Sequence, residues 1–425
     1  MRTYFLLALL LVISFDQVTA QRACLTTEYQ QKELSLNPAT ALQANTIEQF
    51  IQNEIVKRQA TVTSVNGASP TARLQQMVIK IPVVVHILYH QSSENISDQQ
   101  VYSEIEMLNK CFRRTCADTV NTPAVFKPLA ADCEIEFQLA ISDPRRRSTT
   151  GIIRTYTPIT EWSSDDKMKF SSEMGSDAWD ANSYLNIWVC NIRRVAGYSS
   201  VVGGPAAKDG IVVDYSVFGT NTSSGYEMGK TAVHETAHWL GLKHIWGDAL
   251  CGDDLVEDTP RQGNFTSGCP TGIRVSCGNS PSGDMYMNYM DYTSDQCTNL
   301  FTEGQKTRMR TSFAPGGPRV SILSSLGLTT PLIIEAPLPE EGPKWLHYQI
   351  YPNPVSTELT LDVAYDARWV GKTLTISNVH GQAVMQVLIT SKIQKINTSR
   401  LSTGIYFLSG KKEDGSFIKQ KFIKM

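Results

Sequence analysis

The sequence has little that would hold it in a membrane or on a nucleic acid. After residue 20 it has no apolar run long enough to cross a bilayer as a helix. Its 39 Lys and Arg nearly balance its 41 Asp and Glu, and the basic residues form no cluster. Histidine is also scarce, with 7 in 425 residues. We therefore expect no transmembrane segment and no nucleic-acid partner, and any cluster of histidines is informative.

The N-terminus has the pattern of a secretory signal peptide. Arg2 precedes an apolar run from Tyr4 to Phe15, and the small residues 18–20 follow as a cleavage site. We expect residues 1–20 to be removed, which leaves Gln21 first. The nine cysteines suit an oxidising destination outside the cytoplasm.

Three of the seven histidines stand within residues 234–244, which read HETAHWLGLKH. On a helix, His234 and His238 lie one turn apart on one face, so both imidazoles can reach one metal ion. Glu235 lies beside them, where its carboxylate can take a proton from a metal-bound water. The spacing predicts a metal site with its own general base.

His244 can be a third ligand only if the helix ends first, because ten residues of helix rise about 15 Å. Gly241 permits this, since glycine tolerates the left-handed conformation that ends a helix. Three nitrogen ligands with one open position are typical of catalytic zinc, whereas structural zinc usually has four protein ligands. We therefore expect Zn²⁺ at His234, His238 and His244.

The extended motif resembles that of the metzincin zinc endopeptidases. This resemblance implies a turn with a methionine beneath the zinc, and Met290 within residues 288–292 (NYMDY) fits it. It also implies that Tyr292 hydrogen-bonds the oxyanion of the tetrahedral intermediate. Ordinary aromatic packing is the alternative for Tyr292.

Among the metzincins, the chain resembles the pappalysin family, which includes the ulilysin-like and mirolysin-like enzymes. The resemblance covers roughly residues 24–315. Its further segments are residues 81–86 (IPVVVH), 118–123 (DTVNTP), 251–260 (CGDDLVEDTP), 288–297 (NYMDYTSDQC) and Phe301-Thr302. The motif alone indicates a zinc hydrolase, and the resemblance implies a peptidase that acts on proteins or peptides.

The resemblance also implies two disulfides, Cys251 with Cys277 and Cys269 with Cys297. The sequence alone would allow three connectivities for these four cysteines. The family pattern gives no partners for Cys111, Cys116, Cys133 and Cys190. A Cys116–Cys133 bridge is one option, and Cys190, which ends an apolar run, is expected to be a buried free thiol.

Two further site predictions come from the same resemblance. The acidic loop matches one that holds a structural Ca²⁺, for which the oxygen ligands would come from Asp254, Val256, Asp258 and Thr259. The alternative is a solvated loop. Asp295 lies where the family walls its S1′ pocket, so we expect cleavage on the N-terminal side of Arg or Lys; an exposed loop aspartate is the alternative.

The polar region that precedes the first apolar strand has the pattern of a pro-segment. Cys24 lies at its start, and its thiolate could be a fourth zinc ligand that keeps the zymogen silent. A lone cysteine, or one with an unassigned partner, is the alternative. The expected organisation is a signal peptide 1–20, a pro-segment 21–73, a catalytic domain 74–317, a linker 318–344 and a C-terminal domain 345–425.

The catalytic domain is predicted to be α/β (α+β), metzincin-like, with a twisted mixed sheet and an active-site helix at about 227–240. Apolar runs predict strands, and a capping pattern at residues 97–100 predicts a helix. The expected strands are 81–89, 134–140, 184–189 and 210–213, and a last helix is expected at 303–312.

The C-terminal domain is predicted to be a small β-sandwich, because short β-rich runs alternate there with turns. It resembles the sorting domain of the Bacteroidota type IX secretion system. The matching segments are residues 351–354 (YPNP), 376–381 (ISNVHG), 401–408 (LSTGIYFL) and 421–425 (KFIKM). This implies export through the periplasm of a Gram-negative bacterium, by the type IX machinery, to the surface or the medium. A carbohydrate- or protein-binding module would need an aromatic platform or metal cluster, which the segment lacks.

These observations predict a secreted zinc endopeptidase that is made as a zymogen. The rival hypothesis is a non-catalytic, zinc-stabilised surface adhesin on the same fold. An adhesin would have no chemical need for Glu235 beside an open zinc position.

Overall fold

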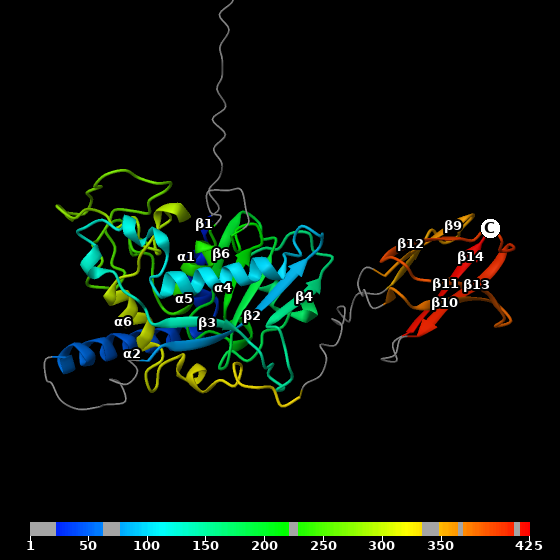
Figure 1. The fold of residues 1–425 in the computed structure, drawn as a ribbon, viewed down its shortest axis with the longest axis horizontal. Helices are drawn as coiled ribbons and strands as arrows, with labels where there is room; N and C mark the ends of the chain where they lie inside the picture. Colours follow the sequence, from blue (N-terminus) through cyan, green and yellow to red (C-terminus); the bar gives the residue numbers. More distant parts are fainter. Residues whose placement is uncertain (1–22, 63–76, 221–227, 334–347, 364–368, 412–416) are drawn as a thin grey trace, which may run out of the picture.

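The computed structural model describes residues 23–62, 77–220, 228–333, 348–363, 369–411 and 417–425. These residues form two regions, each with its own hydrophobic core: a large α/β region and a small β region (Figure 1). The expected signal peptide lies outside the described residues. None of the helices in the described ranges is long and apolar enough to span a membrane.

The expected pro-segment forms a short strand and two helices, which are β1 (Ala23–Cys24), α1 (Thr26–Leu36) and α2 (Pro38–Val62). β1 joins the edge of the main sheet, and α2 packs against α6 (Glu303–Thr311), as Figure 1 shows. The N-terminal segment is therefore folded onto the domain that it precedes.

The main sheet has seven strands in the order β1-β6-β7-β5-β2-β3, and β4 also pairs with β2. β6 runs antiparallel to β7, and the other pairings are parallel. The sheet is therefore mixed, as expected. Its strands after β1 are β2 (Ile79–Tyr89), β3 (Ile135–Leu139), β4 (Ile152–Tyr156), β5 (Leu185–Cys190), β6 (Val195–Ser199) and β7 (Ile211–Asp214).

The helices begin where the sequence supplies side-chain caps. α4 (Asp98–Phe112) begins after Ser97, whose hydroxyl accepts a hydrogen bond from the Gln100 amide. α6 begins with a full capping box at Thr302. α4 and α5 (Lys230–Trp239) cover one face of the sheet and enclose the main core with it. Short 3₁₀ helices connect these elements: η1 (Ala117–Asn121), η2 (Lys127–Leu129), η3 (Lys167–Lys169), η4 (Ser171–Glu173), η5 (Ala206–Lys208), η6 (Asp295–Cys297) and η7 (Val320–Ser324).

The expected linker 318–344 begins too early. Ile322 of η7 is buried in the main core, and the Gly327 carbonyl accepts a hydrogen bond from the Ile141 amide at 2.9 Å. The Ile333 carbonyl similarly accepts from the Ser148 amide at 2.9 Å. Residues 318–333 therefore belong to the α/β region. The linker was placed too early because composition along the chain does not show which apolar residues find partners across the fold.

Both disulfides implied by the resemblance are present, at Cys251–Cys277 and Cys269–Cys297. They close loops in a stretch between α5 and α6 that has little regular structure. The structure does not contain the Cys116–Cys133 disulfide that was one option. The Cys116 sulfur lies 3.4 Å from the Cys111 sulfur instead, and Cys133 is a buried free thiol. Cys190 is a buried free thiol, as expected.

The C-terminal region consists of a four-stranded sheet, β11-β10-β13-β14, and a three-stranded sheet, β12-β9-β8. Residues from both sheets share one core, so the region is a β-sandwich, as predicted. Along β9 and β10, every second residue is buried, so each sheet turns one face toward the shared core. The strands are β8 (Gln349–Tyr351), β9 (Glu358–Asp362), β10 (Thr373–Asn378), β11 (Ala383–Leu388), β12 (Ile393–Asn397), β13 (Gly404–Lys411) and β14 (Phe417–Lys424).

Candidate active site

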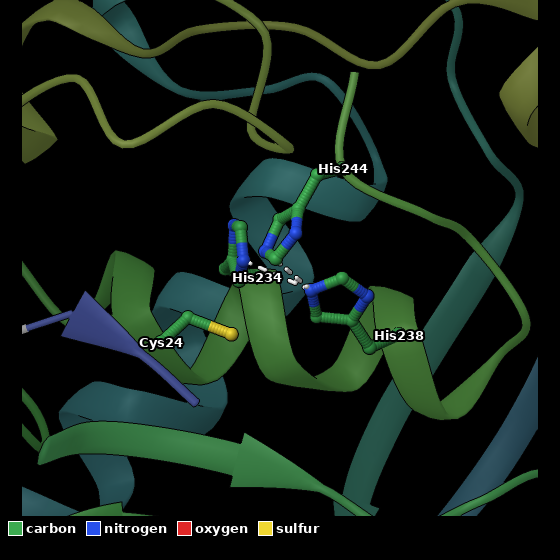
Figure 2. A group of neighbouring side chains, drawn as sticks. All are labelled: Cys24, His234, His238 and His244. Atoms are coloured by element: carbon green, nitrogen blue, oxygen red, sulfur yellow. Dashed lines mark hydrogen bonds between the residues drawn. The ribbon is translucent and has the colours of Figure 1, made fainter. Parts of the chain in front are cut away.

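The three histidines of the motif converge on one point. Figure 2 shows His234 and His238 projecting from α5 and His244 reaching back from the loop that follows it. Nε2 of His238 lies 3.0 Å from Nε2 of His234 and 3.1 Å from Nε2 of His244. Two nitrogens bound tetrahedrally at about 2.0–2.1 Å from one zinc would lie roughly 3.4 Å apart. The separations are thus slightly shorter than those of a zinc site but of the same order.

The other nitrogen of each ring holds it in place. Nδ1 of His234 donates to the Tyr289 carbonyl at 2.7 Å, and Nδ1 of His238 donates to the Leu242 carbonyl at 2.9 Å. The three Nε2 atoms then turn their lone pairs toward one another, an arrangement that is repulsive unless a cation lies between them. Burial lowers the pKa of all three rings, so the imidazoles are neutral, as metal ligands must be. The residues therefore fit a zinc ion.

Gly241 makes the third ligand reachable. α5 ends at Trp239, and Gly241 follows with φ of 95°, a conformation that side chains rarely adopt. Its amide donates to the His238 carbonyl at 2.8 Å, which closes the turn. The chain then reverses and brings His244 to the other two histidines, as the motif predicted.

Glu235 lies beside the histidines and is fully buried. Burial raises its pKa to about 7. The side chain has room only because residue 197 of β6 is glycine: a Cβ atom there would lie 2.9 Å from Cγ of Glu235. Strand β6 therefore limits the space of the carboxylate on the side away from α5.

Cys24 completes the cluster. Its sulfur and one nitrogen of each histidine all lie within 4.8 Å of one another, and Figure 2 shows the sulfur turned toward the rings. Burial, and then the charge of Glu235, raise the pKa of the thiol. A cation at the cluster would act in the opposite direction, because it stabilises the thiolate.

The N-terminal segment reaches this position by pairing with β6. Cys24 stands opposite Gly197 in a parallel register, and the Leu25 amide donates to the Gly197 carbonyl at 3.0 Å. Thr26 then donates its hydroxyl hydrogen to Oε2 of Glu235 at 2.7 Å. The segment therefore covers both the histidine cluster and the carboxylate.

A second contact holds the pro-segment behind the active-site helix. Arg308 of α6 is buried, and its two Nη atoms lie 3.0 and 2.6 Å from the carboxylate oxygens of Glu48 on α2. The same guanidinium donates through Nε to the Gly241 carbonyl at 2.7 Å. The pair links the pro-segment to the turn that brings in His244.

Tyr292 and Met290 lie next to the cluster. The Tyr292 hydroxyl donates to the Cys24 carbonyl at 3.1 Å, and its ring centroid is 5.0 Å from that of His244. Met290 is fully buried, and its carbonyl accepts from the Ile245 amide at 3.2 Å. The turn that carries both residues therefore packs directly against the loop of the third histidine.

The sequence did not predict three contacts of His244. Nδ1 of His244 donates to Oδ1 of Asp248 at 2.5 Å, and the Thr27 hydroxyl lies 3.2 Å from the same nitrogen. Trp246 stacks on the imidazole with centroids 4.3 Å apart and planes inclined by 7°. A carboxylate four residues after the last histidine was the available signal, because metal-bound histidines commonly donate their other N–H to a carboxylate.

Asp295 is buried rather than exposed, which removes the alternative of an exposed loop aspartate. Its Oδ2 accepts hydrogen bonds from the Met228 amide at 3.0 Å and the Lys230 amide at 3.1 Å. These amides lie at the N-terminus of α5, where a carboxylate is favoured by the helix dipole. Asp295 therefore caps the helix that carries the histidines.

The acidic loop brings three of its four expected ligands together, namely Asp254, Val256 and Thr259. Thr259 donates its hydroxyl hydrogen to Asp254 at 2.9 Å, and its oxygen lies 2.8 Å from the Val256 carbonyl. Burial raises the pKa of Asp254 to about 7. The carboxylate of Asp258 accepts from the Thr302 hydroxyl and the Gly304 amide at the start of α6. The oxygens suit a hard cation, although Asp258 also serves α6.

The sequence of this chain matches a known protein family and several known proteins. Residues 169–314 match the family described as pregnancy-associated plasma protein-A. An extracellular metalloprotease of the fungus Sordaria macrospora is 31% identical over 270 residues, which cover 61% of this chain and 82% of that protein. The chain belongs to the pappalysin family of metalloproteases. The rival adhesin hypothesis is therefore set aside.

This pappalysin-family chain is also similar in structure to proteins that have been solved. Mature mirolysin of Tannerella forsythia, in complex with a cleaved peptide, is 45% identical, covers 58% of this chain and 96% of its own, and has a TM-score of 0.57. A promirolysin mutant from the same organism is 41% identical, covers 65% and 95%, and has a TM-score of 0.58. Residues 349–425 match the secretion system C-terminal sorting domain. The protein is thus a secreted zinc metalloendopeptidase that is made as a zymogen.

Proposed function

We propose that His234, His238 and His244 hold the catalytic zinc of this endopeptidase. The convergence of their three Nε2 atoms supports this assignment most directly. When bound there, zinc lowers the pKa of a water molecule and polarises the carbonyl of the peptide bond to be cleaved. Asp248 and the Tyr289 and Leu242 carbonyls would orient the rings by accepting their Nδ1 protons.

Glu235 is the proposed general base and acid. Its carboxylate takes a proton from the attacking water and later delivers that proton to the leaving amine. A group with a pKa near the working pH can both accept and give up a proton, and burial raises the pKa of Glu235 to about 7. Gly197 keeps the space above the carboxylate clear.

Tyr292 is proposed to hold the oxyanion. Its hydroxyl already donates to a carbonyl oxygen next to the histidine cluster, that of Cys24. A substrate carbonyl in a similar place would receive the same hydrogen bond, which strengthens as negative charge develops on the oxygen. Met290 is proposed as the methionine of the turn beneath the zinc, because its side chain is buried and its carbonyl accepts a hydrogen bond from Ile245 of the ligand loop.

Cys24 is proposed as the ligand that silences the zymogen. Its sulfur lies where a fourth zinc ligand would exclude the catalytic water. Residues 21–73 would then form the pro-segment. Cleavage before Arg would allow the enzyme to process itself at Lys57–Arg58 or at Ala72–Arg73. Lys57–Arg58 lies inside α2 with Arg58 only 8% exposed, whereas peptidases bind extended chain. Ala72–Arg73, the other candidate, lies outside the described residues and is the site that we favour.

Three further proposals concern specificity, stability and export. Asp295 would select Arg or Lys after the cleaved bond, because a buried carboxylate favours a cationic partner. Asp254, Val256, Asp258 and Thr259 would bind a structural Ca²⁺. The C-terminal domain from residue 345 would engage the type IX secretion machinery, in line with the sorting-domain match at residues 349–425.

The test of the catalytic assignment separates chemistry from metal binding. Glu235→Ala in the processed enzyme should lose casein hydrolysis by more than a hundredfold while retaining zinc, because the base is lost and the ligands remain. His238→Ala should instead lose the metal, as measured by elemental analysis. Turnover by Glu235→Ala at the parent rate would reject the assignment.

A further inference from the structure

Tyr29 of the pro-segment fills a site built by the domain behind it. The tyrosine lies on α1 and is 4% exposed. Its hydroxyl donates to Oδ2 of Asp166 at 2.6 Å, and its ring centroid lies 4.6 Å from that of Tyr198 on β6. Burial, followed by the charge of Asp166, raises the pKa of Tyr29, so the phenol keeps the proton that it donates.

The receiving residues do not depend on Tyr29 for their placement. The Tyr198 hydroxyl donates to Oδ1 of Asp166 at 3.0 Å, and Nζ of Lys169 lies 2.9 Å from the same oxygen. Lys169 also donates to the Lys208 carbonyl at 2.8 Å. The apolar wall includes fully buried Met168 and Trp188. Loss of the pro-segment would therefore leave an aromatic wall with a carboxylate oxygen at its base.

The charges at this site favour a neutral hydrogen-bond donor. Burial acts to raise the pKa of Asp166, but Lys169, Tyr29 and Lys208 together lower it, so the carboxylate is ionised. Lys208 lies 3.1 Å from Asp166 and 2.9 Å from Glu33, and Glu33 would leave with the pro-segment. The Asp166 carboxylate would then face two ammonium groups, while the Asp209 carboxylate, which also acts on Lys169, is paired with Arg319. An incoming Arg or Lys side chain would be repelled there, whereas a phenol would not.

The site lies beside β6, along which the N-terminal segment runs past the histidine cluster. The pro-segment runs along β6, and the Ser199 amide donates to the Thr26 hydroxyl at 2.8 Å. Gly197 faces Glu235, whereas Tyr198, the next residue, packs on the opposite side with Tyr29. Once β1 is gone, β6 is an open edge on which an extended peptide can pair. Every second side chain of that peptide would point to the side of Tyr198.

We propose that, after removal of the pro-segment, the space filled by Tyr29 becomes a substrate subsite that binds a tyrosine side chain of the peptide to be cleaved. This subsite rests on the proposed function, because it requires a peptidase that loses its pro-segment. It lies on the side of β6 to which Tyr198 points, opposite the side where Gly197 faces the catalytic carboxylate. In the zymogen, Tyr29 occupies it and adds to the block imposed at Cys24.

The test uses the processed enzyme and a proteome-derived peptide library read by mass spectrometry. Tyrosine should be enriched at one position at least two residues from the cleaved bond, and that position reports the direction in which the substrate lies on β6. In matched peptides, changing this tyrosine to Phe should lower kcat/KM about tenfold to a hundredfold, because a hydrogen bond to a charged acceptor is lost. Arg in its place should be cleaved no better than Phe.

Two variants assign any preference to the carboxylate. Asp166→Asn should bring the Tyr-to-Phe ratio of kcat/KM close to one. The matched control is Asp165→Asn, whose half-exposed side chain lies 3.7 Å from Lys167, and it should leave the ratio as in the parent. Should Asp166→Asn fail to fold, Tyr198→Phe, which loses a donor to Asp166, should lower the ratio.

The outcomes separate this proposal from the one on which it rests. Cleavage without enrichment of tyrosine, or equal kcat/KM for the Tyr and Phe peptides, would overturn the subsite while the peptidase assignment stands. No cleavage of any library peptide would reject both.

Discussion

The hydroxyl of Thr26 lies 2.7 Å from Oε2 of Glu235 and donates a hydrogen bond to it, although the two residues are 209 positions apart in the sequence. The partner of the Thr26 side chain is the proposed general base, and the sulfur of Cys24 faces the proposed zinc ligands. The pro-segment therefore contacts both halves of the catalytic centre. Because the Cys24 sulfur and the Thr26 hydroxyl contact different groups, the contribution of each to silencing the zymogen can be tested separately.

Cys24→Ala should give a leaky zymogen that matures faster than the parent, because the sulfur that would exclude the catalytic water is gone. Thr26→Val keeps the side-chain volume and the zinc-facing sulfur, and it removes only the hydrogen bonds of the hydroxyl with Glu235 and the Ser199 amide, so it should have a smaller effect in the same direction. Ser35→Ala, at an exposed position of α1, is the control. Maturation is followed by gel electrophoresis and peptide hydrolysis. A Cys24→Ala precursor as silent and as slow to mature as the parent would contradict the switch.

Asp248→Asn should weaken zinc binding by about tenfold to a hundredfold, because the charged acceptor that fixes the His244 ring is lost. Zinc affinity is measured by competition with a chelator in the processed enzyme, where Thr27 no longer contacts the same ring. Asp253→Asn removes an exposed carboxylate that pairs with Arg261 and should leave the affinity unchanged. Unaltered zinc affinity in Asp248→Asn would show that the histidine is held by packing on Trp246 instead.

Removal of calcium by EGTA at fixed zinc should lower the Tm, since an ion that binds only the folded state stabilises it by mass action. Asp254→Asn should abolish this sensitivity because it loses the buried carboxylate nearest to Val256 and Thr259. Asp253→Asn is again the control. An EGTA-insensitive Tm in the parent would mean that the loop is held by its own hydrogen bonds.

Asp295→Asn should reduce the enrichment of Arg and Lys after the cleaved bond if this carboxylate sets specificity. It should also lower the stability by about 1 kcal/mol, because the side chain caps α5 through the Met228 and Lys230 amides. The two effects are measured separately, by a peptide library and by thermal unfolding. A loss of stability with full retention of the Arg and Lys preference would leave Asp295 only its structural role.

The sequence by itself determined the histidine ligands of the proposed site, because their spacing on a helix is a local property and Gly241 supplies the turn that the third ligand needs. It also predicted the main strands of the sheet, since β2 is a continuous apolar run. The caps at Ser97 and Thr302 are local as well. Such features depend on neighbours within a few residues, which a sequence displays directly.

Only the tertiary structure decided which distant residues meet. The partners of Thr26, Tyr29 and Glu48 lie in the domain that the pro-segment covers, more than a hundred residues away, and no local pattern announces them. The sequence analysis did not predict β6, because Ala196 and Gly197 interrupt its run of large apolar residues. Yet Gly197 is required there, since any side chain would collide with Glu235. Such pairings arise when separate segments pack together, so they follow from the fold and not from spacing along the chain.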